Sequence, residues 1–447
     1  METVPGHEIT YHLVVYGKGG QERPEHDGLY SRVLIGEAAN TGPSDIFLFS
    51  HGWNGDVPAA RTQYGNWLAA MADCPDDRAK AGAMPGGFRP LLVGLHWPSK
   101  AWGDEEFGGA SFAAGLDAQA PGEPDGVGAD DVQLLVDRFA DRLADSEKTR
   151  QALRIIIEAA LDDPAPANLP AHVREAYLAI DDETGMSRDG VGGGPGDDRE
   201  SFDPEATYQA CLQEDIAAFG GPSLGGILAP LRVLTFWQMK RRARVFGESG
   251  GAELLTALQQ AAPAARFHLM GHSFGCIVAS AAVAGPAGWA RDRRPVHTLI
   301  LVQGALSLWS FCSSIPALPG QHGYFNPVIT AGLVQGPVVS TTSVHDRAVG
   351  LFYPLGARAR QQVDYLAPGQ LPVYGGIGAF GIQGPGLRIT DEVLRPASEP
   401  YDFRPALVYN LDADAVIAQG GGASGAHSDI CHPGVAHAVW QAVTTAA

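Results

Sequence analysis

Short runs of apolar and β-branched residues recur along the chain, each bounded by Gly, Pro, Asp or Asn. Runs of this length and composition are typical of buried strands. Several show no alternation with polar residues, which favours strands covered on both faces, as in a parallel sheet. The pattern predicts eight strands: Tyr11–Tyr16, Leu29–Ile35, Ile46–Ser50, Leu91–Leu95, Phe267–Met270, Thr298–Val302, Val338–Thr342 and Ala406–Leu411.

Helical periodicity occupies the stretches between these runs. Apolar residues recur at i, i+3, i+4 and i+7 from Tyr64 to Met71, and a second apolar stripe covers Leu254–Leu258. Pro433 is well placed to open a C-terminal helix, and Val132–Leu161 also has helical spacing. Strands that alternate with helices predict a doubly wound α/β domain.

Two stretches break the alternation. Roughly residues 100–250 separate the fourth predicted strand from the fifth, far beyond an ordinary connection. Residues 348–405 separate the seventh from the eighth and are rich in Gly around Tyr374–Gly386. We interpret both as insertions into one core. The prediction is a core of residues 1–100 and 250–447, with the Gly-rich insertion 348–405, and a helical, acidic insertion or lid over 101–249.

The net charge is strongly negative but is confined mainly to two segments. The chain has 50 acidic and 31 basic residues, a formal charge of −19, which argues against nucleic-acid binding and against adhesion to anionic membranes. Ala101–Asp131 has eight acidic and no basic residues, and Asp181–Glu205 has nine acidic residues and two Arg, so they hold −15 together. We expect this acidity to keep the insertion solvated beside a nearly neutral core suited to uncharged substrates.

Cysteine usage and apolar segments define the expected compartment. The five Cys are scattered and form no C-x-x-C pair, which indicates neither a disulfide framework nor a zinc site. Met1–His7 has no basic start and no apolar run, and the apolar window Thr298–Gly320 is too broken to span a membrane. We therefore expect a cytoplasmic protein without a metal, a cofactor or stable membrane insertion. The oligomeric state is not indicated.

The pattern G-x-S-x-G occurs three times, at residues 221–225, 247–251 and 271–275. A nucleophilic serine needs a strained strand-to-helix turn, in which small flanking residues permit close packing. Only Ser273 follows a predicted strand and precedes a run of small apolar residues, Cys276–Ala284. Ser273 is therefore the candidate nucleophile. We interpret Ser223 as a loop serine and Ser249 as a helix-cap serine.

A carboxylate should orient the base that takes the serine proton. With a nucleophile of this type, the acid and then the base follow it in the chain. Asp346 comes directly after the seventh predicted strand, at the edge where open α/β sheets carry their chemistry. Asp412 and Asp414, after the eighth strand, are the alternatives.

His427 is the candidate base. It lies in a Gly-rich loop between the last predicted strand and the last helix. His432 lies at the start of that helix and His437 inside it, where a histidine is usually packed. His345 adjoins the candidate acid, but continued strand geometry would point it the other way.

Backbone N–H groups must stabilise the oxyanion that forms during acyl transfer. One donor should be the amide of Phe274, directly after the nucleophile. The other should come from the turn after the third strand, where Gly52 permits a tight turn and Trp53 offers its N–H.

These pieces resemble the serine esterase and lipase-like branch of the α/β-hydrolase superfamily. The resemblance covers the His-Gly-Trp turn from His51, the Gly-His-Ser-Phe-Gly turn around Ser273, Asp346 and His427. It implies the α/β-hydrolase fold: an eight-stranded, mostly parallel sheet with helices on both faces, here with a large insertion between strands 4 and 5. It also implies hydrolysis of uncharged or apolar carboxylic esters through an acyl-enzyme.

Four residues are expected to line the substrate site: His51, Gly52, His272 and, from the insertion, Trp237. Gly226–Met239 is apolar and Lys240–Arg244 is basic, so one interpretation is a lid helix of a lipase or phospholipase that meets a lipid interface. A packed helix with a solvated basic end is the interpretation we favour. A non-catalytic binding module is a further alternative, and an amidase or acyltransferase would use the same residues.

Overall fold

A computed structural model of the chain describes residues 1–25, 28–53, 55–99, 129–213, 226–286, 294–350, 370–421 and 424–445. The chain forms two compact units. The first, here called the sheet unit, comprises Met1–Ser99, Arg242–Tyr353 and Val373–Ala447. The second, called the helical unit, comprises Lys100–Arg241 and Pro354–Pro372.

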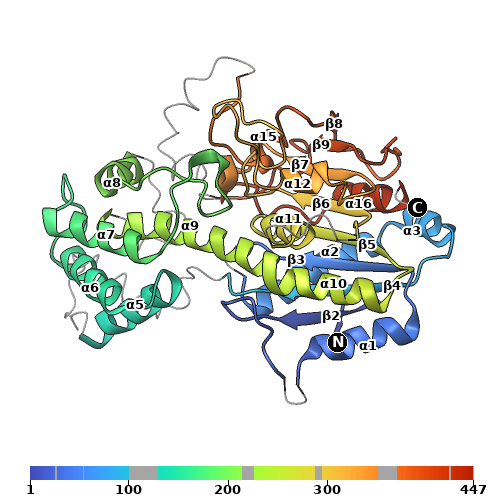
Figure 1. Cartoon of the computed structure of the whole chain (residues 1–447), viewed down its shortest axis with the longest axis horizontal. Coiled ribbons are helices and arrows are strands. Elements are labelled where there is room, and N and C mark those ends of the chain that lie inside the picture. The colour runs from blue at the N-terminus through green and yellow to red at the C-terminus, as the bar shows by residue number, and fades with distance from the viewer. Residues whose placement is uncertain are drawn as a thin grey trace. The chain divides into compact units, whose positions relative to one another are not determined.

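The sheet unit is built on a nine-stranded sheet with the order β1-β2-β4-β3-β5-β6-β7-β9-β8 (Figure 1). Only the β1–β2 pair is antiparallel, so the predicted α/β class and the mostly parallel sheet are confirmed. The strands are β1 (Glu2–Thr3), β2 (Thr10–Val15), β3 (Asp45–Ser50), β4 (Pro90–His96), β5 (Arg266–His272), β6 (Thr298–Val302), β7 (Val338–Thr342), β8 (Ile389–Val393) and β9 (Val408–Asp412).

The sheet has nine strands and not the eight predicted, for two reasons. The predicted strand Leu29–Ile35 is wrong, because this segment belongs to the helix α1 (Tyr30–Thr41). Leu34 and Ala38 of α1 are buried, one helical turn apart, whereas Val33 is exposed. In addition, β1 and β8 are strands that the sequence pattern missed.

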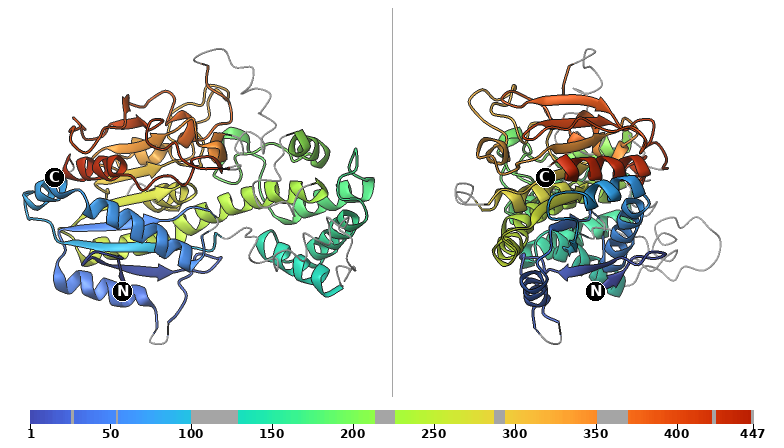
Figure 2. Two further views of the ribbon diagram at one scale, coloured as in Figure 1. Left: turned by 180° about the vertical axis from the view of Figure 1, so that it is seen from behind. Right: turned by 90° about the vertical axis from the view of Figure 1, so that its right-hand side faces the viewer.

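Helices cover both faces of the sheet (Figures 1 and 2). On one face α10 (Ala252–Ala261) packs between α1 and α11 (Gly275–Ala284), and α11 contacts β3, β5 and β6. On the other face α16 (Pro433–Thr445) packs against α2 (Val57–Ala72) and α3 (Pro75–Gly82). The short helices α12 (Asn326–Thr330) and α15 (Ile377–Phe380) lie in connections between strands.

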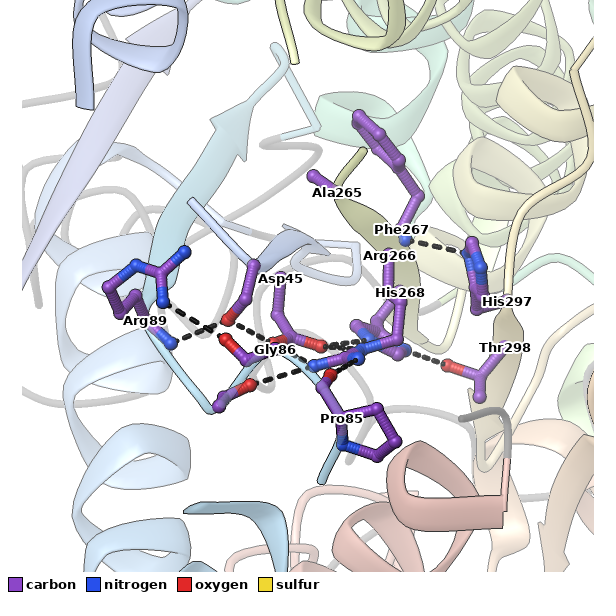
Figure 3. Close-up of polar contacts among 12 residues, drawn as sticks. Asp45, Pro85, Gly86, Arg89, Ala265, Arg266, Phe267, His268, His297 and Thr298 are labelled. Atoms are coloured by element: carbon purple, nitrogen blue, oxygen red, sulfur yellow. Dashed lines mark hydrogen bonds and ion pairs between the residues drawn. The ribbon is translucent and has the colours of Figure 1, made fainter. Parts of the chain in front are cut away.

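A buried polar cluster ties the amino ends of β3 and β5 together (Figure 3). The Asp45 carboxylate accepts hydrogen bonds from Arg266 Nε (2.7 Å) and Nη2 (2.8 Å) and from His268 Nε2 (3.1 Å). Burial alone would raise the pKa of Asp45, but these bonds and one from Ser44 lower it to about 2. The cluster lies at the edge of the sheet opposite to the carboxyl ends of its parallel strands.

The helical unit contains α5 (Ala129–Arg142), α6 (Glu147–Asp162), α7 (Ala171–Glu183), α8 (Pro204–Gln213) and most of α9 (Ala229–Phe246). None of the helices within the described ranges is long and apolar enough to cross a membrane.

Part of the acidity of the helical unit is buried, contrary to our expectation that it only solvates the segment. Asp181 pairs with Arg188 (2.6 Å) and with the buried Arg199 (2.7 Å). Asp198 and Lys240 form a second pair, and both side chains are buried. Lys240 therefore does not provide the solvated basic helix end expected after Met239. The other acidic segment lies almost entirely outside the described residues.

Candidate active site

Ser273 occupies the turn between the central strand β5 and the helix α11. Its φ of 57° lies in the left-handed region, which is strained for any residue with a side chain. The strand β6 holds this conformation, because the Ser273 N–H donates to the Val302 carbonyl at 3.2 Å. The Ser273 carbonyl in turn accepts from the Ala305 N–H at 3.2 Å. The turn thus presents one serine in a fixed, strained geometry.

The two glycines of this G-x-S-x-G pattern are required by close backbone contacts. A Cβ on Gly271 would lie 2.2 Å from the Gly275 carbonyl oxygen. A Cβ on Gly275 would lie 2.2 Å from the Ser50 carbonyl oxygen at the end of β3. Both distances are far below van der Waals contact, so the pattern here reflects packing of the turn against the sheet.

The other two matches have different surroundings. Gly247–Gly251 forms a π-helical turn between α9 and α10, and Ser249 Oγ donates to the Val245 carbonyl at 2.7 Å. Ser249 therefore lies inside a continuous helical run, not at a helix cap as predicted, and follows no strand. Ser223 lies outside the described residues.

The structure brings Asp346 and His427 into direct contact, although 81 positions separate them. His427 Nδ1 donates to Asp346 Oδ2 at 2.8 Å, and Asp346 Oδ1 accepts from the Val349 N–H at 2.9 Å. Because Nδ1 carries the proton, Nε2 of His427 is left as the basic nitrogen. This is the tautomer that a general base for a serine requires.

Backbone contacts hold the His427 loop beside the turn after β7. The Ala426 N–H donates to the His345 carbonyl at 2.9 Å, next to a bridge between Asp346 and Gly425. Gly425 has φ 57°, and a Cβ on it would lie 2.3 Å from the His345 carbonyl oxygen. The glycine therefore allows the close approach that brings His427 to the acid.

The alternative acids and bases have other partners. Asp414 Oδ1 accepts from the Val344 N–H at 2.8 Å. His432 pairs with Asp429 at 2.7 Å, and His437 with Asp77 at 2.6 Å. Asp412 accepts a backbone hydrogen bond at the end of β9. None of these contacts involves the Ser273 turn.

His427 is connected to the Ser273 turn by a contact with His272. The His427 ring packs on the ring of His272, the neighbour of Ser273, with centroids 4.7 Å apart. Among the described residues the Ser273 hydroxyl and Nε2 of His427 make no hydrogen bond with each other. Catalytic contacts of this kind often tighten only when substrate binds.

The turn after β3, which carries one predicted oxyanion donor, lies close to Ser273. A Cβ on Gly52 would lie 2.8 Å from Ser273 Cβ, so this glycine lets the turn approach the nucleophile. The rings of Trp53 and Phe274 lie 5.8 Å apart. Phe274 is the N-cap residue of α11, and its N–H precedes the first intrahelical hydrogen bond. One predicted donor thus follows Ser273 in the chain, and the other belongs to the residue after Gly52; that these two N–H groups bind the oxyanion stays a prediction.

Two residues that sequence reasoning missed hold this turn in place: His96, the last residue of β4, and Ser99, which follows the strand. Ser99 Oγ accepts from the Gly55 N–H (3.0 Å) and lies 2.9 Å from the Gly52 carbonyl. His51 Nδ1 donates to the Gly52 carbonyl (2.9 Å), and its Nε2 lies 3.0 Å from Nδ1 of His96. Burial lowers the pKa of His51 to about 3 and that of His96 to about 4, so both rings are neutral. The only sequence signal of His96 and Ser99 was their position at or just beyond the carboxyl end of a strand.

The predicted substrate contacts of His51 and Trp237 stay predictions. His51 is 1% exposed, and both of its ring nitrogens have protein partners. Trp237 lies on α9 in the helical unit and is also 1% exposed. Within the described ranges, no group of three or more His, Cys, Asp or Glu is arranged to hold a metal ion.

Three features of the site bear on its chemistry. It combines a strained serine, a histidine with a free basic nitrogen, and a buried carboxylate that orients the histidine. Comparison with protein-family models, with curated proteins and with solved structures finds no match to this chain.

Proposed function

We propose that this chain is a serine hydrolase of the α/β-hydrolase type that cleaves uncharged or apolar carboxylic esters. The observation that carries the proposal is the contact between His427 and Asp346 next to the strained Ser273 turn. The three residues come from the loops after β5, β7 and β9. A serine, a histidine and a carboxylate in these roles activate a nucleophile in many unrelated hydrolases.

In the proposed reaction Ser273 Oγ attacks the ester carbonyl carbon while Nε2 of His427 takes the hydroxyl proton. The amides of Trp53 and Phe274 stabilise the oxyanion. His427 then gives its proton to the departing alcohol, which leaves an acyl group on Ser273. Water, deprotonated by His427, attacks this acyl group and releases the acid. Asp346 stabilises the protonated ring without itself taking the proton.

The preference for apolar, uncharged acyl groups is supported by the side chains around the turn. The aromatic rings of Trp53 and Phe274, the two residues predicted to donate to the oxyanion, lie 5.8 Å apart. The nearby histidines, His51 and His272, are held neutral by burial, which lowers the pKa of each to about 3. These two neutral rings therefore supply no positive charge that would attract an anionic substrate.

The direct test compares Ser273→Ala with Ser249→Ala, which changes the serine of another G-x-S-x-G match. Ser273→Ala should lower kcat on a soluble short-chain ester by on the order of 10⁶-fold and abolish labelling by a fluorophosphonate. Ser249→Ala should leave both unchanged. Labelling that persists in folded Ser273→Ala protein would refute the assignment.

A panel of esters with graded acyl length then defines the substrate. Turnover that rises with acyl length up to a limit supports an esterase for apolar acids. A rate jump as an ester passes its solubility limit would instead indicate a lipase. Wild-type protein that neither labels nor turns over any ester would be a non-catalytic binding module.

A further inference from the structure

His272 stands between the nucleophile and the base, and the proposed reaction gives it no role. It is the last residue of β5, directly before Ser273 in the chain. β5 pairs with β3 on one side and with β6 on the other, which makes this strand a rigid support. The His272 ring is 5% exposed and meets the Trp67 ring of α2 edge-on, with centroids 6.5 Å apart.

One ring nitrogen of His272 binds the backbone of the base. Nε2 lies 2.9 Å from the carbonyl oxygen of His427. A carbonyl only accepts, so Nε2 carries the proton and donates it. The two imidazole rings also pack at 4.7 Å between centroids. His272 therefore fixes both the main chain and the ring of His427 relative to the strand that carries Ser273.

The other ring nitrogen of His272 lowers the stability of the folded protein. Nδ1 of His272 is buried and has no hydrogen-bond partner among the described residues. An unpaired buried acceptor costs about 1–3 kcal/mol. Burial also lowers the pKa of the ring to about 3, so the ring cannot gain stability by becoming charged. A phenylalanine would fill the same space without an unpaired polar atom.

The loop that carries the base needs such an anchor. It contains Gly420, Gly421 and Gly425, and glycine loses more conformational freedom on ordering than any other residue. The neighbouring Ala426 N–H holds the loop to the His345 carbonyl at 2.9 Å, and the His427 N–H donates to the Ser424 carbonyl at 3.3 Å within the loop itself. The bond from His272 connects His427 directly to β5.

We propose that His272 is a positioning residue: its Nε2–H bond and its ring contact hold His427 at the distance from Ser273 that proton transfer requires. This inference rests on the proposed function, since it concerns the same serine and base. The hydrogen bond from His272, the residue before Ser273, would then align His427 with Ser273. A misplacement of about 1 Å at such a site can cost on the order of 10²-fold in rate.

Two substitutions separate positioning from simple packing. His272→Phe keeps the ring contact but removes the donor, and His272→Gln keeps a donor at the Nε2 position but removes the ring. We expect His272→Phe to lower kcat on a soluble ester by on the order of 10²-fold with little change in KM. Its urea midpoint should stay close to that of the wild type, because the change removes the unpaired Nδ1 but also leaves the His427 carbonyl without its donor. His272→Gln should recover most of the lost kcat.

The control is His297→Phe, which removes another neutral histidine, close to β5 at the opposite edge of the sheet. It should leave kcat unchanged. Wild-type kcat in folded His272→Phe protein would overturn the inference. So would a loss of stability in His272→Phe together with no recovery of kcat in His272→Gln, because that pattern belongs to packing alone. Failure of the proposed function appears separately, as labelling that survives in Ser273→Ala.

Discussion

Asp45 offers a quantitative test of how the sheet is held together, away from the candidate site. Its carboxylate is buried and accepts hydrogen bonds from Arg266 and His268, which lower its pKa from 3.8 to about 2 (Figure 3). A folded-state pKa below the unfolded value stabilises the protein above the unfolded pKa, and this contribution is lost as the pH falls. From the two pKa values, Asp45 contributes about 2.5 kcal/mol at pH 6 and about 1.3 kcal/mol at pH 3.

The perturbation is Asp45→Asn, measured by urea unfolding between pH 6 and pH 3. Removing one partner of a buried ion pair leaves the Arg266 guanidinium uncompensated, so we expect a loss of about 3–5 kcal/mol at pH 6. The difference between wild type and variant should shrink by about 1 kcal/mol at pH 3. Asp402→Asn is the matched control, because Asp402 pairs with Arg404 at 2.8 Å but is 82% exposed. It should change little at either pH. A wild-type advantage that stays constant from pH 6 to pH 3 would refute the reasoning.

Two further predictions concern the candidate site. Asp346→Asn should fold normally but lower kcat on a soluble ester by on the order of 10⁴-fold, because it removes the charge that selects the His427 tautomer. Asp414→Asn, assayed in parallel, should keep its activity. Equal losses of kcat in the two variants would count against Asp346 as the acid. Gly275→Ala should abolish folding or activity, because its Cβ would meet the end of β3 at 2.2 Å. Gly36→Ala in α1, where a Cβ meets nothing within 4 Å, should instead raise the thermal midpoint, and a tolerated Gly275→Ala would contradict the packing argument.

Much of the sheet could be predicted because its central strands are buried on both faces. Such strands need unbroken apolar runs, as in β3 and β6, and those runs are visible in the sequence. β8 was missed because its sequence, Ile-Thr-Asp-Glu-Val, is polar and half exposed at the edge of the sheet. Leu29–Ile35 was predicted as a strand but belongs to the helix α1, because a short apolar run does not distinguish a strand from a helix.

The candidate site was predictable where its signals are local. The strand, the G-x-S-x-G turn and the small residues of α11 all lie within a few positions of Ser273. Asp346 and His427 followed from their places after strands. The contact of His272 with His427 could not be predicted, because it joins residues 155 positions apart and depends on how a Gly-rich loop folds back. The support from Ser99 was hidden for the same reason.

The pairing of β3 with β5 also has a consequence for folding during synthesis. Their register joins Asp45 to Arg266, so β5 is made long after β3 and after β4, the strand on the other side of β3. Closing so long a loop costs little extra free energy, since each doubling of loop length adds only about 0.6 kcal/mol. The delay matters more: at about 5–20 residues per second, the roughly 170 residues between β4 and β5 take about 10–30 s to make. During that interval one edge of β3 has no partner strand. A chaperone that shields this unpaired edge of β3 on the ribosome would therefore have its largest effect before residue 272 emerges.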